Sequence, residues 1–188
     1  MIRYYTNREL AQKLEVNLAR WKRWSRSFLP PDPLGGMQSG YARQYLFKDL
    51  FKVFFGGYLL AHLKLSVTDS RKVLDEVTSW LGSNGFFDWD FSGKNKKDSE
   101  SFSNDVWLYF CPLASPGSDS QTDFRYLIRK VIDVQPRGSV GNRQTVVTYG
   151  EEFIPEKDFS ASSVLRHPDM HGLNMSALYD TVVAKLTQ

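Results

Sequence analysis

Residues 1–33 contain start and stop patterns for two short helices, and these limit the fold more than any other part of the sequence. Thr6-Asn7-Arg8-Glu9 has the form of a capping box, in which the Thr6 hydroxyl accepts the Glu9 amide proton and the Glu9 carboxylate returns to the cap. We expect a helix over about 7–14, a tight turn over 15–17, and a second helix from Leu18 to about Ser25. Asn17 is a suitable N-cap for that helix. Prolines at 30, 31 and 33 must end it, because proline has no amide proton to donate.

Helical periodicity divides each of these two helices into an apolar and a polar face. The residues expected to be buried are Leu10, Ala11 and Leu14 in the first helix and Leu18, Trp21 and Trp24 in the second. The other faces of the second helix carry four basic residues, Arg20, Lys22, Arg23 and Arg26. Two short helices joined by a three-residue turn, the second of them basic, form the helix-turn-helix arrangement.

The following residues predict a small hairpin and two further helices. A glycine-rich turn over 34–40 leads into a return strand over 41–45. Helical periodicity resumes at Lys48 and continues to about Leu63. A last helix in this half runs from Thr68 to Trp80, capped by Thr68 or Ser66. Its inward residues are Val73, Leu74, Val77 and Leu81. Residues 1–82 are therefore expected to form one domain.

The second half has β character. Residues 83–104 read as a glycine- and serine-rich linker, although its aromatic residues should pack against something. Strands are expected over 105–111, 124–134 and 144–149, and a helix closes the chain with a stripe of Leu178, Val182 and Leu186. That stripe fits pairing with a second subunit or covering of its own sheet equally well. Residues 105–188 are thus expected to form a small α+β domain, and the whole chain is expected to be α+β.

The charge is distributed unevenly between the two halves. The chain has 24 Lys and Arg and 21 Asp and Glu, a net charge of +3. Residues 1–82 carry 13 basic and 7 acidic residues, a net charge of +6, and residues 83–188 have a net charge of −3. A basic front half joined to a slightly acidic back half fits a nucleic-acid-binding head with a separate partner module.

Several other classes of protein lack support in the sequence. No run reaches the roughly 18 apolar residues of a membrane span, and the N-terminus lacks the pattern of a signal peptide. With Cys111 as the single cysteine, we expect a cytoplasmic protein without cofactor or metal. His167 and His171 are four residues apart, but Pro168 between them favours a loop over a metal-binding helix. No nucleophile elbow, phosphate loop or zinc-protease motif is present, so an enzyme is not expected.

From Tyr5 to about Leu81 the sequence resembles the MerR family of bacterial transcription regulators. That family opens with a helix-turn-helix, runs through a Leu-Pro-Pro segment into a wing, and continues with two more helices. Phe28-Leu29-Pro30-Pro31 matches the segment before the wing, and Ser39-Gly40-Tyr41 resembles the entry to the wing's second strand. The wing's Arg-x-Tyr-x-x-x-Asp-Leu pattern is present from Arg43 to Leu50. The resemblance covers about 80 residues, under half the chain, and implies an N-terminal winged helix-turn-helix.

In the MerR family the second helix enters the major groove of DNA, and the Arg and Tyr of the wing lie against phosphates. The resemblance therefore implies the following DNA-binding residues: Asn17, Arg20, Lys22, Arg23, Arg26, Tyr41, Arg43 and Tyr45. It implies a homodimeric transcription regulator of the bacterial nucleoid that binds double-stranded DNA and receives a small-molecule or protein effector. MerR-like winged folds also resemble excisionases. The alternatives are therefore an architectural DNA-binding protein or a protein-interaction adaptor that has kept the fold.

Overall fold

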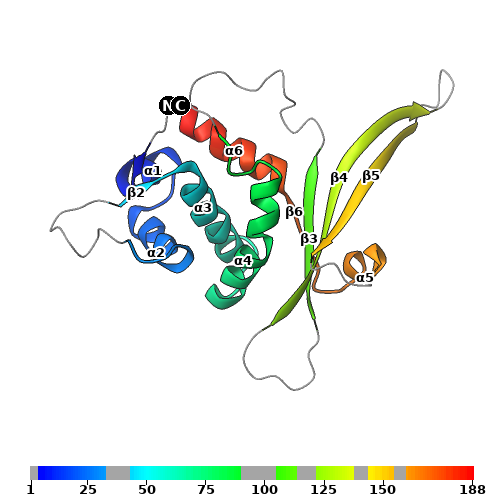
Figure 1. Cartoon of the computed structure of the whole chain (residues 1–188), viewed down its shortest axis with the longest axis horizontal. Coiled ribbons are helices and arrows are strands. Elements are labelled where there is room, and N and C mark those ends of the chain that lie inside the picture. Colours follow the sequence, from blue (N-terminus) through cyan, green and yellow to red (C-terminus); the bar gives the residue numbers. More distant parts are fainter. Residues whose placement is uncertain (1–3, 33–42, 90–104, 114–121, 138–143, 155–159) are drawn as a thin grey trace. The chain divides into compact units, whose positions relative to one another are not determined.

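A computed structural model of the chain describes residues 4–32, 43–89, 105–113, 122–137, 144–154 and 160–188 (Figure 1). It confirms the prediction of a mixed α+β protein. The chain divides into two compact units. The first comprises Met1–Ser99 together with Leu178–Gln188, and the second comprises Glu100–Ala177. The first unit is thus discontinuous in sequence, which differs from the predicted division at residues 82 and 105.

The two helices predicted at the N-terminus are present with the predicted caps. Helix α1 spans Asn7–Lys13 and has the complete capping box of Thr6 and Glu9. Helix α2 spans Leu18–Phe28, and the side chain of its N-cap Asn17 accepts the amide protons of residues 19 and 20. Helix α2 ends three residues later than expected, because the proline restricts only the residue before it, Leu29, which is extended.

A small two-stranded sheet joins the residues before α1 to the residues after α2. Strand β1 (Tyr5–Thr6) pairs antiparallel with β2 (Gln44–Tyr45), so that Tyr5 lies opposite Tyr45. The sequence predicted the return strand near this position, but its partner β1 lies before α1. The glycine-rich turn and Tyr41 lie outside the described residues.

Helices α3 (Phe47–Ala61) and α4 (Val67–Ser83) complete the predicted helices of this unit. The side chain of Ser66 accepts the amide proton of Asp69, so Ser66 rather than Thr68 caps α4. Glycines of α3 allow α2 to approach closely. A Cβ atom at Gly56 would lie 2.7 Å from the Phe28 ring, and one at Gly57 would lie 2.2 Å from the Trp24 ring.

Part of the predicted linker packs into the helical unit instead. Phe86 is buried and stacks on Phe51, with ring centroids 6.1 Å apart. The Trp89 ring contacts Phe47 at 5.1 Å. The expected aromatic packing is therefore present up to Trp89, and residues 90–104 lie outside the described part.

The C-terminal helix α6 (Met175–Thr187) contributes to the helical unit from Leu178 onward. Its Tyr179 ring lies 5.6 Å from that of Phe47 and 5.9 Å from those of Phe51 and Phe86. The Lys13 ammonium donates to the Leu186 carbonyl at 3.3 Å, and Lys185 forms an ion pair with Glu15. Most of the helix that was predicted to belong to residues 105–188 thus packs on the N-terminal unit.

The second unit is built on an antiparallel sheet with strand order β5-β4-β3-β6. The strands are β3 (Val106–Leu113), β4 (Asp123–Arg137), β5 (Gln144–Ile154) and β6 (His171–Asn174). The three predicted strands are present and longer than expected. His171 is in β6 rather than in a loop. The short helix α5 (Ala161–Leu165) packs on one face of the sheet, where Val164 is buried with Cys111 and Leu127.

Candidate nucleic-acid interface

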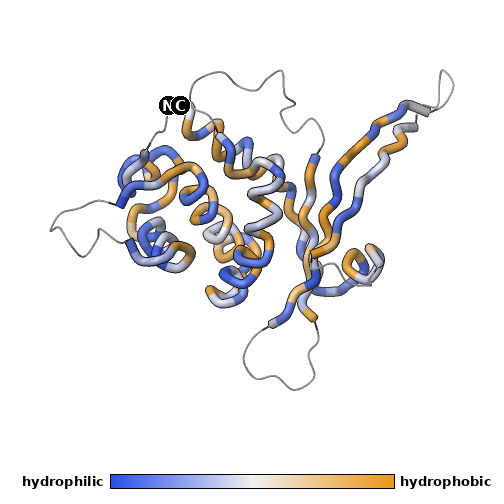
Figure 2. Tube along the Cα trace, viewed as in Figure 1, coloured by the Kyte–Doolittle hydropathy of each residue, from blue (hydrophilic) through white to orange (hydrophobic). Residues whose placement is uncertain are grey.

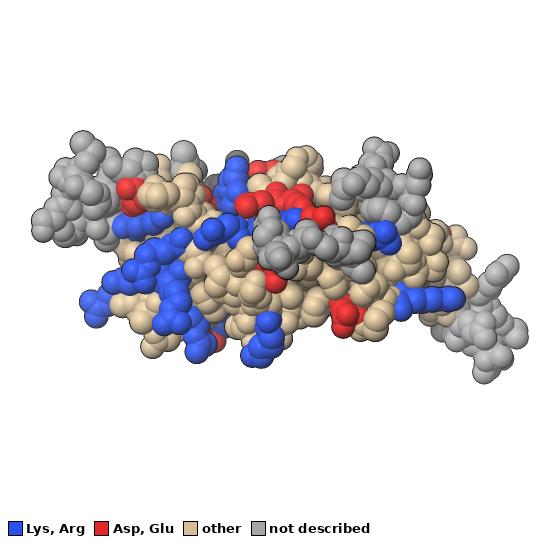
Figure 3. Space-filling model, turned by 90° about the horizontal axis from the view of Figure 1, so that it is seen from below, with Lys and Arg blue, Asp and Glu red and all other residues tan. Residues whose placement is uncertain are grey.

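Helix α2 separates a buried aromatic face from an exposed basic face, as its sequence predicts. The buried residues are Trp21, Trp24, Ser25 and Phe28. The side chains of Arg20, Lys22, Arg23 and Arg26 are all exposed. Leu18, which was expected to be buried, is 37% exposed. In Figure 3, Lys and Arg side chains gather on the surface of the helical unit, to which α2 belongs.

Within the described residues, the basic face of α2 lacks acidic partners. Helix α2 contains no acidic residue, and none of its four basic side chains forms an ion pair with the residues that the structure describes. Arg20 lies in the first turn, where the helix dipole already presents partial positive charge and a cation is unfavourable by about 0.3–1 kcal/mol. Arg20 thus adds a full positive charge to the N-terminal end of α2, a position that favours an anion such as phosphate.

Tyr45 holds α2 in place from within the unit. It is only 1% exposed, and its ring lies edge-on to that of Trp21 with centroids 5.8 Å apart. Its hydroxyl donates to Asn7 Oδ1 at 2.7 Å, so the 2.6 Å contact with Ser25 Oγ is one in which the serine donates. Burial raises the pKa of Tyr45 above its ordinary value. The predicted phosphate contact by Tyr45 is therefore replaced by a positioning role, because its polar atom is used inside the domain.

Arg43 occupies the base of the predicted wing, where it fixes the backbone that follows α2. Its Nη1 donates to the Pro30 carbonyl at 2.9 Å, and its guanidinium lies 5.7 Å from the centroid of the Tyr45 ring. The side chain is half-buried. A guanidinium has five N–H donors, so one bond to a carbonyl leaves donors for an anion. Arg43 thus combines a structural contact with the capacity for the predicted phosphate contact.

Two further residues, Asn17 and Tyr41, were predicted to bind DNA. Asn17 is exposed at the start of α2, but its carbonyl oxygen is engaged in capping the helix. Tyr41 lies outside the described residues. The structure thus brings the basic residues of α2 together on one helix, with Asn17 at its start.

Three supporting residues were not predicted from the sequence. Asn7 and Ser25 bind the Tyr45 hydroxyl. From helix α4, Arg71 Nε donates to the Ser27 carbonyl at 2.9 Å and so satisfies a carbonyl in the last turn of α2. No local pattern could have identified Arg71, because its partner is 44 residues away and depends on how the helices pack.

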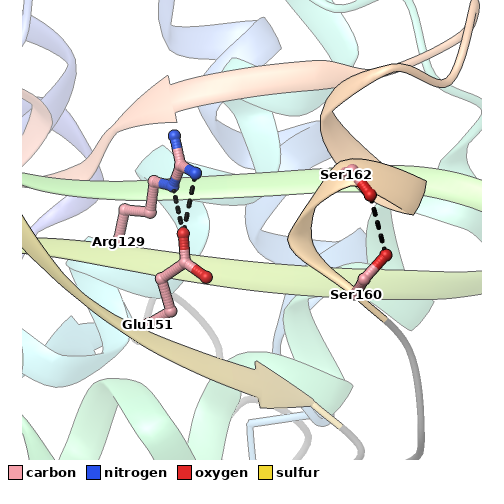
Figure 4. A network of polar contacts seen from close by, with 4 residues as sticks. All are labelled: Arg129, Glu151, Ser160 and Ser162. Carbon is pink, nitrogen blue, oxygen red and sulfur yellow. Dashed lines mark hydrogen bonds and ion pairs between the residues drawn. The ribbon is translucent and has the colours of Figure 1, made fainter.

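Polar groups of the second unit form separate contacts. Both Nε and Nη2 of Arg129 bind Glu151 Oε1, at 2.8 Å and 2.7 Å, and Ser160 and Ser162 contact each other through their hydroxyls (Figure 4). Among the described residues, neither serine hydroxyl is bonded to a histidine or lysine. The Cys111 thiol is buried, and burial raises its pKa.

In the residues that the structure describes, no group of three His, Cys, Asp or Glu side chains could hold a metal ion. No helix in the same ranges is long and apolar enough to cross a membrane.

Comparison with protein families finds no family model that matches this chain, and comparison with curated proteins finds no matching sequence.

Proposed function

We propose that this chain binds double-stranded DNA through a winged helix-turn-helix of the MerR type and acts as a transcription regulator in the bacterial nucleoid. The observation that carries the proposal is the exposed face of α2, whose four basic side chains lack acidic partners among the described residues. A short α1, a turn and a basic α2 have the element order of a helix-turn-helix.

The packing of α2 supports this use of the helix. A recognition helix must be held at a fixed angle while its other side enters the groove. Here Trp24 lies against Gly57 of α3, and Tyr45 binds the buried Ser25. Both contacts lie opposite the basic face, so that face is left clear for a ligand.

The chemistry of the basic residues assigns them different roles. The forked guanidinium of Arg20 or Arg23 can pair with both major-groove acceptors of guanine, which is worth about 1–3 kcal/mol of discrimination against a wrong base. The ammonium of Lys22 gives a point charge to phosphate, and Arg43 adds a phosphate contact beside the helix. In this proposal the protein acts as a homodimer on two half-sites, and the second unit receives an effector.

Titration of fluorescent duplexes with the full chain tests the proposal. A duplex of the upstream region of its own gene and a random-sequence duplex would be compared at about 50 and about 200 mM salt. We expect tighter binding to the upstream duplex, with log K falling by about 0.9 per neutralised phosphate for each unit of log salt. Absence of binding to either duplex at low salt would refute DNA binding and favour the protein-interaction adaptor.

Variants separate base reading from phosphate binding. Arg23→Ala is expected to weaken binding to the upstream duplex more than to the random one, and Arg43→Ala is expected to weaken both equally. Arg166→Ala is the matched control, because Arg166 is also exposed but lies in the second unit, beyond α5. An equal effect of Arg23→Ala on both duplexes would remove the base-reading role.

A further inference from the structure

The outer part of the β4–β5 hairpin is a two-stranded ribbon. Strand β3 pairs with β4 only between Asp123 and Lys130. From Val131 to Arg137, the only strand that pairs with β4 in the described sheet is β5, over 144–149. Figure 1 shows these two strands continuing past the end of β3. A two-stranded hairpin by itself is only marginally stable in water, so such a ribbon gains from a further strand or layer.

The ribbon also exposes an unusual amount of apolar surface. Ile132 is 56% exposed, Val134 53%, Val146 40% and Tyr149 45%. These four are half of the eight large hydrophobic residues that are exposed in the described ranges. Figure 2 shows hydrophobic positions continuing along both strands of the hairpin. A concentration of exposed apolar side chains on one element marks an interaction surface.

Strand β5 is at the edge of the sheet, and its outer half lacks the features that keep edge strands apart. Edge strands are usually protected by lysine, proline, a bulge or a short length. Residues 145–149, Thr-Val-Val-Thr-Tyr, contain no charge and no proline, and all five favour β structure. The irregularity in the β4–β5 ladder lies on β4, between Val131 and Asp133, so it does not distort the edge strand. The backbone of β5 is therefore suited to accept another strand.

We propose that a second copy of this chain pairs with β5 through residues 145–149, antiparallel and centred on Val147. Two-fold symmetry with antiparallel strands places Val147 opposite its own equivalent and Tyr149 opposite Thr145 of the other copy. The two ribbons then form one four-stranded sheet, in which each β5 has partners on both sides. Its use in reading two half-sites rests on the proposed function, but the pairing itself does not.

The charges of β5 favour this arrangement. Glu151 and Glu152 follow directly after the uncharged segment, and both are exposed. In the antiparallel arrangement the Glu151 residues of the two copies lie eight positions apart, about 27 Å at the spacing of an extended chain. A parallel, in-register arrangement would instead place like charges opposite each other, which is destabilising. The uncharged segment is thus able to pair with itself without electrostatic repulsion.

Sedimentation of the full chain up to about 100 µM, together with a pair of matched lysine variants, tests the proposal. Val147→Lys places two ammonium groups opposite each other and removes two apolar side chains from the interface, which should raise the dimer dissociation constant by about a hundredfold. Val134→Lys is the control, since Val134 is the register partner of Val147 on β4 but does not lie at the edge. Dimers in the wild type and in Val134→Lys, with monomers in Val147→Lys, are expected. A monomeric wild type would overturn the proposal.

Cysteine cross-linking keeps the test decisive if the lysine variant folds poorly. Directly opposite residues have Cα atoms about 4.5–5.5 Å apart, within the range for a disulfide, so oxidised Val147→Cys should form a covalent dimer. Val134→Cys should not, because its equivalent would be three strand spacings away, about 14 Å. Equal cross-linking of the two variants would refute the register. A monomer that still binds DNA would refute this pairing and leave the proposed DNA binding standing, and a dimer that binds no DNA would do the reverse.

Discussion

Replacing Gly57 with alanine would force a methyl group into the indole ring of Trp24. The Cβ atom would lie 2.2 Å from Trp24 Cε3 and 2.4 Å and 2.5 Å from two further ring atoms, whereas ordinary contacts begin near 3.4 Å. The ring, which is largely buried, would have to move by about 1 Å, and overpacking of this kind costs about 1–3 kcal/mol. Alanine recovers up to about 1 kcal/mol of helix propensity. Because an overlap of about 1 Å with a ring puts the cost toward the upper end of that range, we expect a net loss of about 1–2 kcal/mol.

Thermal and urea denaturation of the full chain measure this loss. For a chain of this length, about 1–2 kcal/mol corresponds to a fall in Tm of about 2–8 °C. Because Trp24 belongs to α2, we also expect a displaced helix and, under the proposed function, weaker binding to DNA. Gly82→Ala in α4 is the matched control, since its new Cβ would meet the Phe87 ring at 3.5 Å, an ordinary contact. That variant should be as stable as the wild type or slightly more stable. If Gly57→Ala behaved like Gly82→Ala, the close approach of α2 to α3 would be wrong.

Four further variants test three other contacts. Tyr45→Phe leaves the buried Ser25 and the partly buried Asn7 without their shared hydroxyl and should cost about 1–3 kcal/mol in urea denaturation, without changing the salt slope of the proposed DNA binding. Ser66→Ala should cost about 1 kcal/mol, and Thr68→Ala should cost little; the reverse order would contradict the cap assigned to α4. Burial, with the nearby Asp180 and Asp88 carboxylates, raises the pKa of Tyr179 from 10.0 to about 12. The contribution of Tyr179 to the free energy of unfolding is therefore fully present below pH 10 and is lost as the pH rises toward 12. Urea titrations at several alkaline pH values should show a smaller loss in Tyr179→Phe, and an unchanged loss would refute this burial.

Helix starts were predictable because their determinants are local. The reciprocal contacts of Thr6 and Glu9 lie within one turn, and Asn17 caps α2 with amides two and three residues away. The buried positions Trp21 and Trp24 followed from helical periodicity alone. Periodicity wrongly predicted that Leu18 is buried. A residue in the first turn of a helix has few neighbouring side chains to cover it, even when it is apolar.

Contacts between distant residues were not predictable in the same way. The two residues of β1 are too few to show a strand pattern, and their partner is 40 residues away in β2. The Leu178, Val182 and Leu186 stripe fits any apolar surface, so it did not indicate that α6 packs on the helical unit. The Arg-x-Tyr pattern placed Tyr45 beside phosphate, whereas its hydroxyl binds inside the unit. For the candidate site, the basic face of α2 and the tryptophans buried behind it could be predicted, but the contacts of Asn7, Ser25 and Arg71 that hold α2 could not.

The discontinuous first unit has a consequence for biosynthesis. Its helices α1 to α4 leave the ribosome early, but α6, which packs against Phe47, Phe51 and Phe86, is translated only after the second unit. Since a chain emerges from its N-terminus, these aromatic rings lack their Tyr179 contact until α6 has emerged. The second unit, Glu100–Ala177, is meanwhile complete in sequence and can fold first. A nascent or truncated chain that lacks α6 therefore carries an incomplete first unit, and α2 lies on a completed unit only once α6 has been translated.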